Sequence, residues 1–252
     1  GVPYSNDMNW VGEPDFEALV KLNMSGDLEQ RAAIYARRAA KYAAPEKEHF
    51  AAPLFFSKVT PDGFEDSVEQ PTDQTLLTQR ATAAATDFIQ RHADRPFFLY
   101  LPYSMPHTPL FRSEAFAGRS LGGRYGDVVE EIDVSVGAVR EALAQAGVLE
   151  NTLIVFTSDN GPWLFMREEG GLSGLLRDGK GTTFEGGVRV PAVFSWPGTI
   201  APEVVSDIGS AMDLFSTVMT LVGGDAASAT DGLDLSPRLL GSAPSPRNEM
   251  PY

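Results

Sequence analysis

The sequence contains no cysteine in 252 residues and only three histidines. Disulfide bonds, thiolate metal sites and cysteine nucleophiles are therefore excluded for this chain. It also lacks an apolar run near the roughly 18 residues that a membrane helix needs, and no signal segment stands at its start, which is Gly1 rather than Met. Any reactive chemistry of these residues must come from oxygen and nitrogen side chains.

Positive charge is scarce. Lys and Arg together number 20 against 34 Asp and Glu, which gives a net charge of -14. Such a chain repels nucleic acid and anionic membranes, so both are excluded as partners. It would also repel a small anionic substrate, unless a metal ion or a lysine reversed the field locally.

Apolar segments alternate between helical and extended patterns. The predicted helices cover residues 72–92, 126–147 and 210–223, and the predicted strands cover 97–101, 152–156 and 188–196. Near-continuous apolar strands between helices predict an α/β fold with a mostly parallel central sheet and helices on both faces. In such sheets, ligands bind beyond the carboxyl ends of the strands.

Two of the helices have an apolar stripe. One stripe comprises Leu77, Ala81, Ala84 and Phe88, and the other comprises Val129, Ile132, Val136, Val139 and Leu143. Ser210-Ala211-Met212-Asp213 has the pattern of a capping box, which predicts the start of the third helix. The acidic, Ala-rich region 13–50 is weakly periodic, with Gly26 or Asp27 as helix starts.

Asp159 and Asn160 follow the predicted strand 152–156, in Thr157-Ser158-Asp159-Asn160-Gly161. A carboxylate and an amide oxygen side by side are hard ligands that suit calcium or magnesium. Asp-Asn-Gly is equally typical of an Asx turn. Both interpretations remain open from these residues.

His107 lies between Pro106 and Pro109, just after the predicted strand 97–101. A proline-flanked loop at a strand end suits a general acid or a hydrogen-bond donor to an oxyanion, although a surface histidine has the same pattern. The other two histidines indicate no function, because His49 lies among charged residues and His92 ends a helix that favours positive charge.

Lys180 lies in an unusually glycine-rich segment, residues 170–189. Glycines allow the backbone to approach a ligand closely, and the lysine supplies a positive charge. The segment is not a phosphate-binding P-loop, because Gly181 follows Lys180 where that motif needs Ser or Thr. A flexible loop with a solvated lysine is the alternative.

Several motifs occur together and in order along the chain. They are Pro96-Phe97-Phe98-Leu99-Tyr100 through His107, Tyr125-Gly126-Asp127 with Glu131 and Asp133, residues 156–162, residues 173–189, residues 196–202 and residues 231–237. In this order they resemble the sulfatase family, in particular its arylsulfatase A-like members, within the alkaline phosphatase-like superfamily. The resemblance covers about residues 70–247.

This resemblance implies an alkaline phosphatase/sulfatase-like fold and hydrolysis of a small-molecule or saccharide sulfate ester, with calcium and a formylglycine nucleophile. By position, it implies that Asp159 and Asn160 are calcium ligands. It also implies that His107 and Lys180 bind the sulfate ester, with His107 protonating the leaving oxygen. Members are usually exported, which implies a periplasmic, extracellular or lysosomal location.

Part of the family's catalytic machinery is missing from this sequence. No Cys/Ser-x-Pro-x-Arg motif, the source of formylglycine, occurs, and in the nearest match, residues 242–247, the arginine comes one place too late. The family's N-terminal Asp-Asp calcium pair and Lys-x-His segment are also absent. We therefore expect a chain truncated at both ends. Residues 1–240 would be the C-terminal portion of the catalytic domain, and 241–252 a linker into a missing C-terminal subdomain.

Two other functions remain open. A phosphodiesterase or phosphonate monoester hydrolase of the same superfamily would use the same metal pair, although the Gly-Lys-Gly-Thr-Thr sequence at 179–183 favours a sulfatase. A non-catalytic fragment would fit the missing nucleophile. For the isolated chain we expect weak calcium binding and no activity, because calcium needs about six to eight oxygen ligands.

Overall fold

The chain divides into two compact units. In the computed structural model, residues 28–30, 32–33, 36, 53–225 and 230–250 are described. The first unit comprises Gly1–Ala142 and Met166–Gly170, and the second comprises Leu143–Phe165 and Gly171–Tyr252. Most of the region 13–50 and His49 lie outside the described residues, but Leu28, Glu29 and Gln30 are helical, as expected for a start at Gly26 or Asp27.

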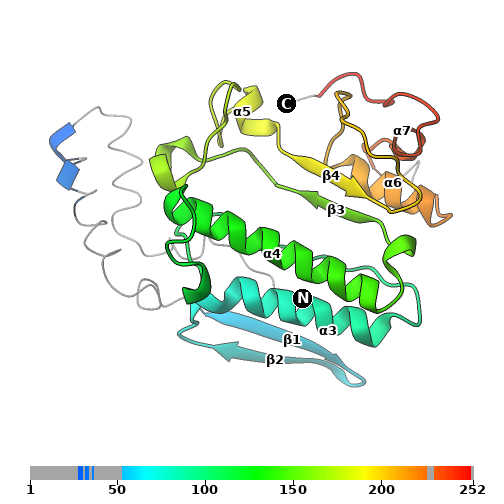
Figure 1. The fold of residues 1–252 in the computed structure, drawn as a ribbon, viewed down its shortest axis with the longest axis horizontal. Coiled ribbons are helices and arrows are strands. Elements are labelled where there is room, and N and C mark those ends of the chain that lie inside the picture. Colours follow the sequence, from blue (N-terminus) through cyan, green and yellow to red (C-terminus); the bar gives the residue numbers. More distant parts are fainter. Residues whose placement is uncertain (1–27, 31, 34–35, 37–52, 226–229, 251–252) are drawn as a thin grey trace. The chain divides into compact units, whose positions relative to one another are not determined.

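The first unit begins with a β-hairpin. Strands β1 (Leu54–Thr60) and β2 (Gly63–Glu69) pair antiparallel, as Figure 1 shows. Gly63 has φ +131° at the turn, a conformation that L side chains rarely adopt. Arg80 of the following helix forms an ion pair with Glu69 at 2.9 Å, which fastens the hairpin to that helix. The sequence patterns above did not predict this hairpin.

The two predicted helices of the first unit are confirmed, with shifted ends. A short 3-10 turn, η3 (Gln74–Leu76), leads into α3 (Leu77–His92), and η4 (Glu114–Phe116) precedes α4 (Gly123–Gln145). Within the described ranges, none of the helices combines the length and apolar character that crossing a membrane requires.

The predicted stripes are only partly correct: Ile132 and Leu143 are buried as expected, but other positions differ. Ala84 and Val129 are exposed, whereas Ala85 and Val128 are buried. The buried sides also carry polar residues, namely Thr78, Asp127, Glu131 and Ser135. Because these polar groups are buried together with apolar ones, the apolar residues alone identified the buried side only in part.

Residues 97–101 form no strand, which corrects the prediction for this segment. Phe98 and Tyr100 are 78% and 76% exposed. A strand is stabilised by backbone hydrogen bonds to a neighbour. Among the described strands, none pairs with this segment.

The second unit contains a two-stranded sheet. Strands β3 (Ile154–Thr157) and β4 (Ala192–Ser195) pair antiparallel, and Figure 1 shows them side by side. The expectation of parallel pairing is therefore wrong for the described strands. Parallel neighbours need a crossover connection, usually a helix. Between β3 and β4 lie only the 3-10 turns of η6 (Leu164–Glu169) and the four-residue α5 (Glu185–Val188).

The remaining elements of the second unit are short. They are η5 (Leu149–Asn151), α6 (Asp213–Leu221) and α7 (Ser236–Leu239). The predicted capping box forms only in part: Ser210 N–H donates to Asp213 Oδ2 at 2.8 Å, but Ser210 Oγ accepts from Met212 N–H at 3.3 Å rather than from Asp213 N–H. The helix itself begins at Asp213, with Met212 as its N-cap and no side-chain cap hydrogen bond.

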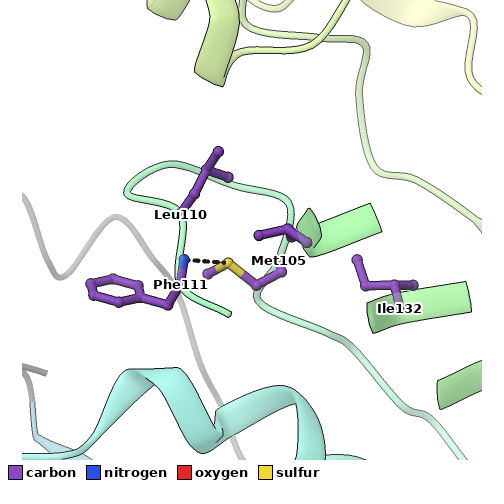
Figure 2. Close-up of a cluster of buried hydrophobic side chains, with 5 residues drawn as sticks. Met105, Leu110, Phe111 and Ile132 are labelled. Carbon is purple, nitrogen blue, oxygen red and sulfur yellow. Dashed lines mark hydrogen bonds between the residues drawn. The ribbon is translucent and has the colours of Figure 1, made fainter. Parts of the chain in front are cut away.

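The apolar core of the first unit lies where a loop meets α4. Met105, Leu110 and Phe111 of the loop pack with Val128 and Ile132 of the helix. Figure 2 shows that Phe111 N–H donates to Met105 Sδ, at 3.3 Å. The loop that contains His107 is therefore closed on itself and held on the helix.

A buried ion pair holds the end of the second unit. Arg247 donates from Nε to Asp213 Oδ2 at 2.8 Å and from an Nη to Oδ1 at 2.5 Å. Asp213 is fully buried. Burial alone would raise its pKa, but hydrogen bonds from Arg247, Leu233 N–H and Ser210 N–H, with the arginine charge, lower the pKa below the ordinary 3.8. Because the folded-state pKa is depressed, this stabilisation is present above about pH 4 and is lost as the pH falls through the folded-state value.

We expect Arg247→Leu to lower the free energy of unfolding by about 3–5 kcal/mol, because it leaves the Asp213 carboxylate buried without its counter-ion. Urea unfolding at pH 7 measures this change.

Arg238→Leu is the matched control. Arg238 also contacts two carboxylates, Glu203 at 2.7 Å and Asp207 at 2.6 Å, but both partners are more than a third exposed. Its loss should cost much less than the loss of Arg247, because solvent screens the exposed pairs. Equal losses in the two variants would contradict the role assigned to the Asp213–Arg247 pair.

Candidate functional site

Asp159 and Asn160 form a turn just beyond the end of β3. Asn160 N–H donates to Asp159 Oδ1 at 3.0 Å, and Asn160 Nδ2 donates to Gly161 O at 3.1 Å. These bonds are not those of an Asx turn, because Gly161 N–H donates to Gly187 O rather than to the Asp159 side chain two residues earlier. The bonding at this strand end is local. It does not exclude metal binding, because a carboxylate accepts several bonds and the amide oxygen of Asn160 is directed away from Gly161 O. Asp159 is exposed and Asn160 half-buried.

The lysine-bearing loop is docked on this turn through backbone hydrogen bonds. Lys180 N–H donates to Pro162 O at 2.8 Å, and Gly161 N–H donates to Gly187 O at 2.9 Å. Within the loop, Gly186 N–H donates to Arg177 O at 2.8 Å. The segment is therefore anchored, and the alternative of a flexible glycine loop does not describe its backbone.

Glycine is required where the two segments meet. A Cβ on Gly161 would lie 1.8 Å from Gly186 O, and a Cβ on Gly179 would lie 2.4 Å from Pro162 O. A Cβ on Gly186 would lie 2.0 Å from Asp178 O. These contacts are far shorter than real Cβ atoms allow, and each neighbour is backbone rather than a movable side chain. The glycines bring Lys180 next to the Asp159–Asn160 turn by letting main chain pack on main chain.

Two neighbours orient the lysine. Asp178 has φ +63°, a left-handed conformation that Asp tolerates better than most residues, and its Oδ1 accepts from Gly179 N–H at 3.0 Å. The Lys180 ammonium lies 5.4 Å from the centroid of the Trp163 ring, within the range of a cation–π contact. The side chain is half-buried. No sequence pattern indicated Trp163, which is recognisable only as a residue adjacent to the Asp-Asn-Gly-Pro turn.

The donor atoms of this turn fit part of a calcium or magnesium site. Asp159 and Asn160 provide two hard oxygens, the type that both ions prefer. Calcium takes about six to eight oxygens. In the part of the chain that the structure describes, no cluster of three or more His, Cys, Asp or Glu side chains gathers to complete the set.

His107 belongs to the first unit, whereas Asp159, Asn160 and Lys180 belong to the second. His107 Nδ1 lies 2.6 Å from Thr108 O, so a proton on Nδ1 is held by that carbonyl. Its backbone N–H donates to Ser104 O at 3.3 Å. The ring is half-buried. By contrast, His92 stacks on Phe88 and Nδ1 lies 2.8 Å from Phe88 O, which is the structural role expected for it.

Comparisons with known proteins identify the family. The sulfatase family model matches residues 34–224. This chain belongs to the sulfatase family. It is 47% identical to arylsulfatase A of Homo sapiens over 188 residues, which is 73% of this chain and 37% of that protein. It is 48% identical to N-acetylgalactosamine-6-sulfatase of Mus musculus over 179 residues, 69% of this chain and 34% of that protein.

A solved sulfatase confirms the fold class. The crystal structure of PsFucS1 sulfatase from Pseudoalteromonas sp. superposes with a TM-score of 0.68 at 30% identity, over 87% of this chain and 44% of that chain. The α/β, sulfatase-like fold is thus confirmed, although only short sheets form among the described residues. This sulfatase chain spans about a third of the length of the curated relatives it matches.

We expect Gly161→Ala to detach the lysine loop, because its Cβ cannot fit beside Gly186 O. Hydrogen exchange of the segment 176–188 should accelerate about tenfold or more, as expected for loss of backbone hydrogen bonds that close the loop.

Gly137→Ala is the matched control. Gly137 lies in α4, and a Cβ there would meet no atom within 4 Å. This change should leave exchange of the loop as it is and stabilise the helix by about 0.5–1 kcal/mol. Unchanged protection of 176–188 in Gly161→Ala would refute the docking.

Proposed function

We propose that the protein hydrolyses sulfate esters, with Lys180 and His107 binding the ester and Asp159 and Asn160 among the ligands of a calcium ion. The observation that carries this proposal is the docking of the Lys180 loop on the Asp159–Asn160 turn. It gathers one cationic side chain and two hard-oxygen donors at the end of one strand, in a chain that belongs to the sulfatase family.

The charge balance supports this arrangement. With a net charge of -14, the protein as a whole repels a sulfate ester. Lys180 brings positive charge to the turn, and its contact with Trp163 keeps the ammonium in place. A bound calcium would add positive charge that polarises the ester oxygens. This local positive charge would offset the repulsion that the acidic chain exerts on an anionic group.

His107 is proposed to protonate the leaving oxygen. A general acid must hold its ring in one orientation, and the short contact between Nδ1 and Thr108 O does this. The proline-flanked loop is in turn fixed on α4 by the apolar cluster of Figure 2.

The nucleophile is proposed to lie outside this sequence, as a formylglycine in the complete protein. The boundary between residues 1–240 of the catalytic domain and a linker at 241–252 is likewise a proposal. So is export to the periplasm, the extracellular space or the lysosome. The proposed substrate is a small-molecule or saccharide sulfate ester.

The isolated chain of 252 residues should not hydrolyse a chromogenic aryl sulfate, with or without calcium. It lacks the family's nucleophile motif and offers only part of a metal site. The measurement is calcium-dependent release of the chromophore by a preparation whose intact mass is verified. Turnover that depends on calcium would show that the chain carries a complete site of its own.

In the full-length protein, Lys180→Ala should reduce sulfatase activity by about 100-fold or more, since it removes a positive charge aimed at the transferred group. Steady-state kinetics on an aryl sulfate measure the loss. Lys58→Ala, which removes an exposed lysine of β1, is the control and should leave activity unchanged.

Activity that survives Lys180→Ala within about threefold would rule out this residue as the sulfate ligand. A phosphonate monoester or phosphodiester hydrolysed faster than the aryl sulfate would identify the protein as a phosphoesterase of the superfamily instead.

A further inference from the structure

Glu131 is a buried carboxylate for which the proposed chemistry has no use. It lies in the middle of α4 and is 2% exposed. Its Oε2 accepts a hydrogen bond from Ser113 N–H at 3.0 Å. Its Oε1 is buried without a hydrogen-bond partner among the described residues.

Stability alone does not explain this residue. A buried carboxylate with one hydrogen bond has lost its hydration without full compensation, so an apolar side chain of similar volume would pack there at lower cost. What the side chain supplies is an acceptor for one backbone N–H, that of Ser113, which an apolar side chain could not provide. Glu131 therefore acts on the segment of the chain that contains Ser113.

That segment contains His107. It starts at Tyr103, whose hydroxyl lies 3.0 Å from Thr82 Oγ1 of α3 and also bonds to Ser135 of α4. It then closes on itself between Met105 and Phe111 and ends at Ser113. Segment 103–113 is thus held at both ends, and Glu131 holds the end that follows His107.

Neighbouring residues of α4 hold the same segment. Val128 and Ile132, which flank Glu131 on the buried side, belong to one apolar cluster with Met105, Leu110 and Phe111 of the loop. Asp127, one turn earlier, accepts from Arg112 Nε at 2.8 Å. Apolar and acidic residues of α4 therefore contact consecutive residues 110–113 of the loop.

We propose that Glu131 is a positioning residue, which sets the place of the His107 ring by anchoring the loop at Ser113. This rests on the proposed role of His107. The anchor acts through the backbone N–H of Ser113, so what matters is an acceptor at this position of α4 rather than a negative charge.

The test uses the full-length protein with three variants. Glu131→Gln keeps an acceptor, and Glu131→Leu removes it. Ser113→Pro removes the donor, and it fits the backbone because Ser113 already has φ -68°. Ile89→Ala, which opens a cavity at a buried position of α3 outside the cluster of Met105, Leu110 and Phe111, is the control for simple destabilisation.

Two measurements are made on each variant: the NMR chemical shifts of the His107 ring, and the kinetics of aryl sulfate hydrolysis. Glu131→Leu and Ser113→Pro should each shift the His107 signals and lower kcat about tenfold or more with little change in KM, and their effects should not add, because they break one hydrogen bond. Glu131→Gln should keep the wild-type shifts and most of kcat. Ile89→Ala should lower the melting temperature and leave the shifts in place.

The possible results separate the two proposals. Unchanged His107 shifts and kcat in Glu131→Leu and Ser113→Pro would overturn the anchor, and so would shifts of the same size in Ile89→Ala. If the wild type hydrolyses no sulfate ester but the His107 shifts follow the expected pattern, the anchor stands and the proposed function fails. If Glu131→Leu does not fold, Ser113→Pro decides by the same criteria.

Discussion

The arrangement of the second unit depends on main chain packing directly on main chain. The lysine loop and the Asp159–Asn160 turn meet through Gly161, Gly179 and Gly186, where a single added methyl group would overlap a backbone carbonyl. Backbone hydrogen bonds across this contact then fix the register. Because carbonyl and amide groups cannot change rotamer as side chains do, the position of the Lys180 backbone follows from the fold of the loop, and Trp163 then contacts its ammonium.

Side-chain contacts, rather than main-chain packing, position the His107 loop of the first unit. Segment 103–113 has little secondary structure, so its order must come from contacts with the helices. Buried apolar side chains supply most of the packing, but apolar contacts are non-directional and do not fix one register. The carboxylates of Asp127 and Glu131 add direction, because each bonds to a particular donor of the loop or its neighbourhood. Apolar packing and these directed hydrogen bonds together define the position of the segment that contains His107.

The placement of charged side chains relates the acidic composition to the proposed binding of an anionic ester. Two of the buried carboxylates are matched by arginines. Arg112 pairs with Asp127, and Arg247 pairs with Asp213. Both arginines are thereby committed to structure. Lys180 lies in a loop shaped by glycines, and backbone hydrogen bonds hold that loop beside the Asp159–Asn160 turn.

The sequence by itself determined the family, the three main helices and the candidate residues Asp159, Asn160, Lys180 and His107. These depend on local order: glycine spacing, strand ends, a capping box and motifs in a fixed succession. Tertiary structure alone decided which way the helices face, since polar residues such as Glu131 are buried with partners far away in the chain.

Tertiary structure also decided which distant strands pair and which distant residues form ion pairs. The hairpin of β1 and β2 could have been predicted from Pro61-Asp62-Gly63 between two strand-like runs, because such turns are local. The antiparallel pairing of β3 with β4, the unpaired segment 97–101 and the bond from Arg247 to Asp213 could not. Each depends on which distant segment comes to lie alongside, and no pattern within a short stretch of residues encodes that.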